Sequence, residues 1–117
     1  MSEPLEPYQL IKTLTGHTRY IAQLVELTDG TLVSGSWDHT IKFWQEGVYV
    51  KTLTGHTSNI RSLIQLSDRA LVSGSSDRTI KIWREGVCIN TLNGHSSDIT
   101  SLVELNDGTL VSGSYDR

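Results

Sequence analysis

Residues 13–51 read TLTGHTRYIAQLVELTDGTLVSGSWDHTIKFWQEGVYVK, and residues 52–90 repeat this stretch with 23 of 39 positions identical. Residues 91–117 begin a third copy. In all three copies, the first five residues end in a Gly-His pair. Every recurring motif is displaced by 39 residues. Self-similarity at a fixed period of this length is typical of architectures built from one repeated structural unit. We therefore expect a lead-in at 1–7 and a repeat segment at 8–117, with units 13–51, 52–90 and 91–117.

Each unit is expected to hold four short strands. In the second unit, β-branched and apolar residues partly alternate over 60–66 and predict the first strand. The turn after this strand reads Asp29-Gly30 in the first unit, which suits a tight hairpin because Gly accepts positive φ. In the second unit Arg69 replaces the Gly, and we expect backbone strain there. The other strands of the first unit are predicted at 31–36, 40–44 and 48–53, with a Glu-Gly turn between the last two.

Three motifs recur together from about Tyr8 to Arg117: Gly-His at the unit start, Ser-Gly-Ser-x-Asp in the middle and Thr-Ile-Lys-x-Trp after it. As a set they resemble the WD-repeat family, although the Trp-Asp pair that names the family is degraded, since Gln45 and Arg84 follow the two tryptophans. The resemblance, together with four strands per period of about 40 residues, implies an all-β fold. We expect a β-propeller segment of three consecutive four-stranded WD-repeat blades, the third incomplete.

His17, Ser34 and Asp38 are residue types suited to nucleophilic catalysis. The same set recurs at identical spacing in the other two units, which indicates a need of the scaffold, and no enzyme activity is expected. The family resemblance implies a buried, hydrogen-bonded tetrad of His, Ser, Asp and Trp in each blade. Its members are His17, Ser34, Asp38 and Trp44; His56, Ser73, Asp77 and Trp83; and His95, Ser112 and Asp116. Ser36 remains an alternative to Ser34, because side chains two apart share a strand face.

The resemblance also points to three partner-binding positions per blade, two flanking the Ile of the first strand and one preceding the turn Asp. They are Tyr20, Ala22 and Trp37; Asn59, Arg61 and Ser76; and Asp98, Thr100 and Tyr115. The three copies differ most at these positions, and Trp, Tyr and Arg are enriched in interface hot spots. We expect a contact patch for a peptide or loop at Tyr20, Trp37, Arg61 and Tyr115. The alternative for Trp37 is that it covers a neighbouring loop.

Composition narrows the function classes further. The chain has 117 residues, a formal net charge of −3 and no basic run, so nucleic-acid binding is not expected. No Cys/His cluster with metal spacing or Gly-rich phosphate loop is present, so no metal or cofactor is expected. The N-terminus lacks the features of a signal peptide, and no stretch has membrane-spanning length. We expect a cytoplasmic protein, with Cys88 acting as a small hydrophobic residue.

The leading hypothesis is a protein–protein interaction scaffold or adaptor that binds peptides or loops of other proteins. Two alternatives stay open: a regulatory propeller in a larger multidomain protein, such as a kinase or ubiquitin-ligase subunit, and a self-assembling oligomeric propeller. Three blades cannot close a ring, and the open ends would expose apolar faces. We therefore expect a fragment of a longer propeller or a homo-oligomer that closes a ring. Residues 8–14 align with the outer strand at 49–53 while the third blade lacks its third strand, which favours the fragment.

Overall fold

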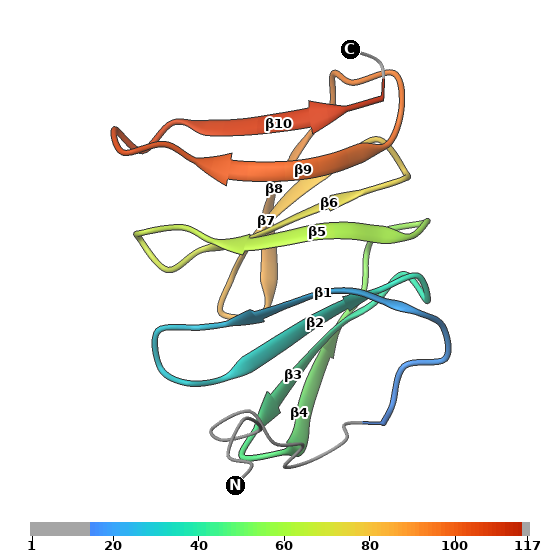
Figure 1. Ribbon diagram of the computed structural model, residues 1–117, viewed down its shortest axis with the longest axis vertical. Helices are drawn as coiled ribbons and strands as arrows, with labels where there is room; N and C mark the ends of the chain where they lie inside the picture. The colour runs from blue at the N-terminus through green and yellow to red at the C-terminus, as the bar shows by residue number, and fades with distance from the viewer. Residues whose placement is uncertain (1–14, 116–117) are drawn as a thin grey trace, which may run out of the picture.

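Ten strands form three antiparallel sheets in the computed structural model, which describes residues 15–115 (Figure 1). The first sheet holds β1 (Ile21–Glu26), β2 (Leu32–Ser36), β3 (Ile41–Gln45) and β4 (Val48–Leu53). The second holds β5 (Ile60–Gln65), β6 (Leu71–Ser75), β7 (Ile80–Arg84) and β8 (Val87–Leu92). The third holds β9 (Ile99–Glu104) and β10 (Leu110–Ser114). The strand expected at 8–14 and the residue Asp116 lie outside the described residues.

The strands follow one another in chain order within each sheet, so each sheet is one blade. The first blade runs β1-β2-β3-β4 and the second β5-β6-β7-β8, while the third shows the pair β9-β10 among the described residues. The inner strands β1, β5 and β9 lie next to one another, and the outer strands spread away from them (Figure 1). The predicted all-β architecture of propeller blades is confirmed, with strand bounds within about one residue of those expected from the pattern.

The turns at one end of the blades follow the residue types predicted for them. Glu46 and Gly47, with φ of 50° and 77°, form the two-residue connection between β3 and β4. Positive φ at both residues matches the right-handed twist of the paired strands. At the turn after β5, Arg69 adopts φ of 75°, where the corresponding Gly30 has 89°. Arg69 is therefore held in the left-handed region that costs an L side chain energy, as the sequence predicted.

The core lies between neighbouring blades. Val33 of β2 packs with Ile60 and Leu63 of β5 in one buried cluster, and all three are fully buried. Gly35 permits this close approach, because a Cβ there would lie 2.6 Å from the Ile60 side chain. A second cluster joins β6 to β9 in the same way, through Val72 and Ile99. Each joint between blades thus repeats the same apolar contacts one period later.

A β-bulge near the start of each inner strand turns one side chain away from the regular alternation. The register between β1 and β2 shifts between Ile21 and Gln23, so Ala22 is the extra residue. Arg61 and Thr100 occupy the same place in the second and third blades. A bulge bends the strand and re-aims its side chain, which strict alternation along the strand would not allow.

The two ends of the blades differ in what they carry. One end, at the right of Figure 1, bears the loops that lead into β1, β5 and β9 and the turns after β2 and β6. We call it the tetrad end, because the predicted tetrads lie beside these loops. The opposite end bears the turns after β1, β3, β5, β7 and β9. Within residues 15–115, no helix is long and apolar enough to cross a membrane.

Candidate functional site

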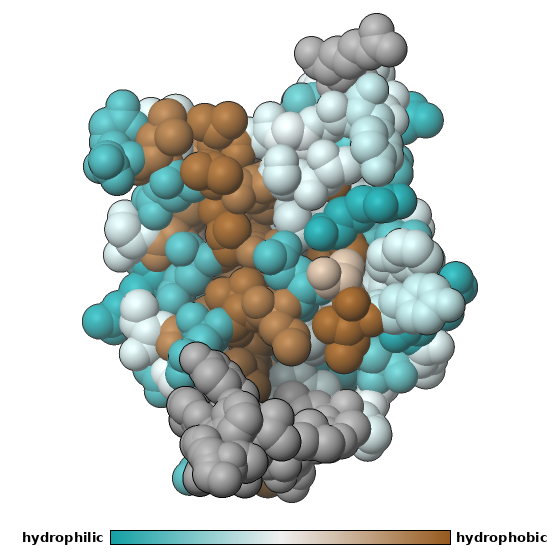
Figure 2. Space-filling view, in the orientation of Figure 1, coloured by the Kyte–Doolittle hydropathy of each residue, from teal (hydrophilic) through white to brown (hydrophobic). Residues whose placement is uncertain are grey.

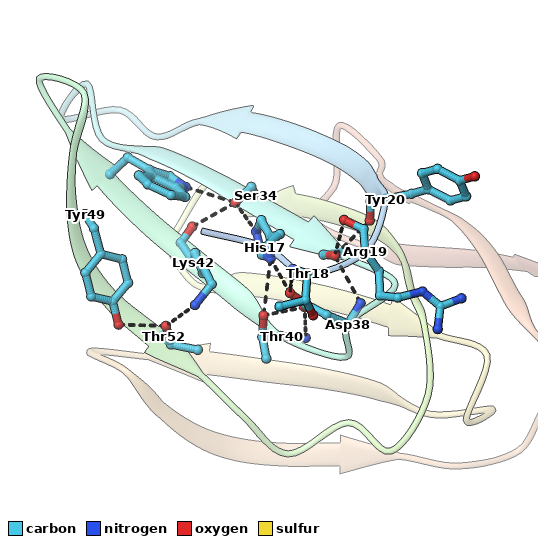
Figure 3. A network of polar contacts seen from close by, with 12 residues as sticks. His17, Thr18, Arg19, Tyr20, Ser34, Asp38, Thr40, Lys42, Tyr49 and Thr52 are labelled. Atoms are coloured by element: carbon cyan, nitrogen blue, oxygen red, sulfur yellow. Dashed lines mark hydrogen bonds and ion pairs between the residues drawn. The ribbon is translucent and has the colours of Figure 1, made fainter. Parts of the chain in front are cut away.

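In the first blade, the four predicted tetrad residues form one hydrogen-bonded chain (Figure 3). Nδ1 of His17 lies 2.8 Å from Oδ2 of Asp38, and Nε2 of the same ring lies 2.6 Å from Oγ of Ser34. Trp44 Nε1 donates to the same serine Oγ at 2.9 Å. The side chains of His17 and Asp38 are 3% and 8% exposed. The chain of contacts links the loop before β1 with β2, the turn after it and β3.

The donor and acceptor groups fix the direction of each hydrogen bond in this tetrad. An ionised carboxylate only accepts hydrogen bonds, so Asp38 requires that His17 carry its proton on Nδ1. In the neutral imidazole with this tautomer, Nε2 accepts a hydrogen bond from the Ser34 hydroxyl, whose oxygen accepts in turn from the Trp44 indole. Every polar group of the tetrad is satisfied, which is what makes its burial tolerable.

Asp38 also fixes the local backbone. Its Oδ1 accepts from the amide of Thr40 at 2.9 Å and from the Thr40 hydroxyl, and its Oδ2 accepts from the amide of Thr18 at 3.1 Å. Burial would raise the pKa of Asp38, but the hydrogen bonds from Thr40, His17 and Thr18 outweigh it and hold the pKa well below its ordinary value. The carboxylate therefore stays ionised and joins the loop before β1 to the turn after β2.

The second blade repeats this geometry. His56 lies 2.8 Å from Asp77 and 2.7 Å from Ser73, and Trp83 donates to Ser73 at 2.9 Å. Burial lowers the pKa of His56, against the opposing effect of Asp77, which favours the neutral imidazole. In the third blade the structure places His95 Nε2 2.8 Å from Ser112 Oγ, while Asp116 lies outside the described residues.

Ser36, the alternative to Ser34, has a different set of contacts. Its hydroxyl donates to the carbonyl oxygen of Tyr20 at 2.8 Å and accepts from the amide of Asp38 at 3.0 Å. Ser36 therefore ties the loop before β1 to the turn after β2 without touching the imidazole. The structure places Ser34 in the tetrad, where its side chain is fully buried and its hydroxyl oxygen accepts from the Trp44 indole.

Two further residues, Cys88 and His39, have side chains capable of catalysis or metal binding. Cys88 lies in β8, half-buried against the core between the first two blades, and its thiol lies 3.3 Å from the carbonyl oxygen of Asn90. His39 is exposed in the turn after β2, with φ of 76°. Over residues 15–115, no three His, Cys, Asp or Glu side chains gather as a potential metal site.

The predicted partner positions come together at the tetrad end. Tyr20 is 71% exposed, and its ring packs edge-on against Trp37 with 5.2 Å between the centroids. The guanidinium of Arg61 lies 5.7 Å from the Trp37 ring centroid and 6.0 Å from that of Tyr115. The first three residues line an open depression together with Ile21 and Ala22. We call Tyr20, Trp37, Arg61 and Tyr115 the contact patch, which spans all three blades.

Arg61 is held in place by polar contacts from two blades. Its Nε donates to Ser76 Oγ at 2.8 Å, and its Nη2 lies 3.3 Å from the carboxylate of Asp98. The Ser76 hydroxyl donates in turn to Asp98 at 3.1 Å. Ser76 and Asp98, predicted as partner contacts, thus also position the guanidinium. The bulge at residue 61 makes this possible, because it turns the side chain toward the tetrad end.

Asn59 and Thr100, also predicted as partner contacts, form hydrogen bonds at the tetrad end. The carbonyl oxygen of Asn59 accepts from the Ser76 amide at 2.9 Å, and the Thr100 hydroxyl donates to the carbonyl oxygen of Gly113 at 3.3 Å.

Sequence reasoning missed Thr40 and Thr79, whose hydroxyls donate to the tetrad aspartates. Their recurrence two residues after each aspartate was the signal that could have identified them.

Comparison with known proteins also finds three repeats in the chain. The family profile described as "WD domain, G-beta repeat" matches residues 8–45, 47–84 and 86–117. A crystal structure of the WD40 β-propeller domain of Doa1 is 33% identical to the chain and superposes with a TM-score of 0.78. That match covers 91% of this chain and 36% of the Doa1 chain. No match was found among proteins with curated functions. The second match holds β4 of the first blade and β5 to β7 of the second, so each profile repeat begins with the outer strand of the preceding blade. The profile matches cover most of the chain, and the chain belongs to the WD-repeat family.

Proposed function

We propose that the chain is a protein-interaction module that binds a peptide or loop of another protein at its contact patch. WD40 propeller domains are generally protein-interaction modules and typically non-catalytic scaffolds. The observation that carries the proposal for this chain is the patch itself, in which one Arg lies against aromatic rings from two other blades.

The residue types of the patch favour binding. Aromatic side chains and Arg supply most of the energy at protein interfaces, because they offer large contact areas and directed polar groups. The fold does not require them here, since the position of Trp37 is Ser76 in the second blade and Tyr115 in the third. Tyr20 and Tyr115 are 71% and 66% exposed, so an area of aromatic surface faces solvent at this end. Such an area at positions that the scaffold leaves free is best explained by a partner.

The patch is also held rigid, which lowers the entropic cost of binding. The amide of Trp37 donates to the Tyr20 carbonyl oxygen at 2.8 Å, and the Tyr115 amide donates to that of Asp98 at 3.3 Å. Arg61 is fixed by Ser76 and Asp98, as described above. Contacts from the loops and turns therefore set the spacing of the side chains before a partner arrives.

Selection from a display library of random short peptides on the immobilised 117-residue chain tests the proposal. Affinities of the enriched peptides are then measured by fluorescence anisotropy for Trp37→Ala, Arg61→Ala and Tyr20→Ala. We expect each variant to weaken binding by about tenfold or more, as interface hot spots do. Tyr49→Ala is the matched control for Tyr20→Ala, because Tyr49 is a 51% exposed tyrosine on the outer strand β4. Failure to enrich any peptide, or affinities that the patch variants leave unchanged, would contradict the proposal.

A further inference from the structure

The end of the blades opposite the tetrads is acidic. Within residues 15–115, the exposed carboxylates lie on the turns after β1, β3, β5, β7 and β9 and on the last residue of β1. They are Glu26, Asp29, Glu46, Asp68, Glu85 and Asp107. Two arginines, Arg69 and Arg84, lie at the same end, and Arg84 is ion-paired with one of these carboxylates, that of Asp68. Carboxylates therefore outnumber cations at this end.

The tetrad end has the opposite balance of exposed charge. Its carboxylates among residues 15–115 each have a basic or imidazole partner. They are Asp38, Asp77 and Asp98. Arg19, in the loop before β1, and Arg78, in the turn after β6, are exposed, and neither forms an ion pair with the described part of the chain. The chain as a whole has a formal net charge of −3, yet the exposed charge of this end is positive.

The two ends differ in the sign of their charge and not in hydropathy. On the face seen in Figure 2, hydrophilic and weakly polar side chains cover both ends, and an apolar band lies over the strands between them. A surface with one sign of charge attracts partners of the opposite sign and raises their rate of association. The positive tetrad end therefore favours a negatively charged partner.

Both exposed arginines are close to residues that form or hold the contact patch. Arg19 precedes Tyr20, and Figure 3 shows the two side chains leaving the same loop and pointing away from the tetrad. Arg78 follows Ser76 by two residues in the same turn, and Ser76 Oγ accepts from Nε of Arg61 at 2.8 Å. The unpaired positive charges thus flank the surface that the proposed partner would occupy.

Arg61 supplies a directed donor within the patch. Its Nε and Nη2 contact Ser76 and Asp98, whereas its Nη1 forms no hydrogen bond with residues 15–115. The side chain is 28% exposed, so Nη1 is available to a partner. A guanidinium binds a carboxylate through short, charge-assisted hydrogen bonds. Because Asp98 compensates the charge of Arg61, the surplus positive charge comes from Arg19 and Arg78.

We infer that the contact patch takes an acidic segment of its partner protein, an inference that rests on the proposed function. One Asp or Glu side chain of the segment accepts from Nη1 of Arg61 beside the rings of Trp37 and Tyr115. Neighbouring carboxylates of the segment face Arg19 and Arg78. The aromatic rings supply contact area, and the arginines select the charge of the segment.

A nucleic acid fits this end less well than an acidic peptide. Nucleic-acid affinity comes from many Lys and Arg side chains that neutralise successive phosphates. The described part of the tetrad end offers two exposed arginines, Arg19 and Arg78, on loops of different blades. A peptide with a few carboxylates matches this small number of spread charges.

The peptides enriched on the immobilised chain give the first test. They should contain more Asp and Glu, and less Lys and Arg, than the unselected library. Replacing their Asp and Glu with Asn and Gln should weaken binding by about tenfold or more. Raising the ionic strength from about 0.1 M to about 1 M should also weaken binding, since the screening length falls from about 10 Å to about 3 Å.

These results separate the inference from the proposed function. Peptides without an acidic excess, whose binding Trp37→Ala and Arg61→Ala still weaken, would overturn the inference and leave the proposed function standing. Failure to enrich any peptide would contradict both. Tighter binding of a labelled single-stranded oligonucleotide than of the enriched peptides would overturn the choice of an acidic peptide.

Charge reversal at single arginines gives the second test. Arg19→Glu and Arg78→Glu should each weaken binding of the enriched peptides by about threefold or more. Arg69→Glu is the matched control for Arg78→Glu, because both arginines are exposed in the second blade with φ of 75° and 74°, but Arg69 lies at the acidic end. Far-UV circular dichroism should show that all three variants keep the fold.

The control separates local charge from net charge. Arg69→Glu changes the net charge of the chain as much as Arg78→Glu does, so it should leave peptide affinity unchanged only if the position of the charge matters. Equal weakening by Arg69→Glu and Arg78→Glu, or unchanged affinity in both Arg19→Glu and Arg78→Glu, would overturn the inference.

Discussion

Nδ1 of His56 lies 2.8 Å from Oδ2 of Asp77, although the two residues are 21 positions apart in the sequence. Their side chains are 1% and 8% exposed. The contact joins the loop before β5 to the turn after β6, and the carboxylate also accepts from Thr57 at 3.0 Å and Thr79 at 2.9 Å. Asp77 is therefore the residue on which the local geometry of the tetrad end depends in this blade.

Replacing Asp77 with Ala should lower the free energy of unfolding by roughly 1–3 kcal/mol, because buried donors lose their acceptor. Urea unfolding followed by tryptophan fluorescence measures the change. Asp107→Ala is the control, since Asp107 accepts from a turn amide, that of Thr109, but lies in an exposed turn where water can replace it. An Asp77→Ala variant as stable as the unmodified chain would show that the tetrad does not hold this end together.

Stability should fall in two steps as the pH is lowered. Burial depresses the pKa of His56 in the folded chain, so below its unfolded value of about 6.5 the unfolded chain binds a proton that the folded chain does not. The pKa of Asp38 and of Asp77 is also depressed when folded, so a second loss begins below about pH 4. The urea midpoint should therefore be lower at about pH 5.5 than at about pH 7.5.

Two histidine variants identify the source of the first step. His56→Gln should reduce the difference between the midpoints at the two pH values, because it removes the buried imidazole that drives it. His39→Gln should preserve the difference, because His39 is exposed in a turn. Equal midpoints for the unmodified chain at both pH values would contradict this account of the imidazole.

Gly74→Ala should destabilise the joint between the second and third blades. The added Cβ would lie 2.5 Å from Cγ2 of Ile99, which is fully buried and has no room to move away. We expect a loss of about 1–3 kcal/mol, typical of overpacking. Gly113→Ala is the matched control at the next repeat position, because the nearest atom there is the hydroxyl oxygen of the exposed Ser101. Similar losses for both variants in thermal unfolding would argue against close packing as the cause.

Arg69→Gly should stabilise the chain. Arg69 has φ of 75°, which costs an L residue about 1–2 kcal/mol, whereas Gly gives up about 0.5–1 kcal/mol through the entropy of the unfolded chain. The expected net gain is about 0.5–1 kcal/mol, measured as a rise in the urea midpoint. Arg69→Ala removes the same side chain beyond Cβ but keeps the strain, so it should not share the gain. A Gly variant no more stable than the Ala variant would contradict the prediction.

Much of the fold could be predicted from the sequence, because the 39-residue offset fixes which segments are equivalent. The choice between Ser34 and Ser36 could not, since alternation along a strand places both on one face. The structure shows that the hydroxyl oxygen of Ser34 lies 2.6 Å from Nε2 of His17, whereas the hydroxyl of Ser36 forms hydrogen bonds with backbone atoms. Sequence position identifies the candidates, and the distances decide between them.

The contacts between blades could not be predicted from the sequence pattern either. Gln65 and Glu104 differ in type and are the last residues of β5 and β9, so nothing in one unit shows that each reaches a turn of the preceding blade. The cluster around Arg61 depends on a bulge, which changes the direction of one side chain without a signature in the residues themselves. Such features arise from the way units are stacked, whereas the periodicity describes only a single unit.

The bulges at Ala22, Arg61 and Thr100 place one residue of each blade outside the regular strand pairing. Each is the extra residue at which the pairing with the neighbouring strand shifts, so its side chain is not constrained by the blade interior. Under the proposed function, a protein of this design changes what it binds by varying one position per blade while the tetrads and the joints stay the same. Randomising these three positions together would therefore yield a collection of binding surfaces on one unchanged framework.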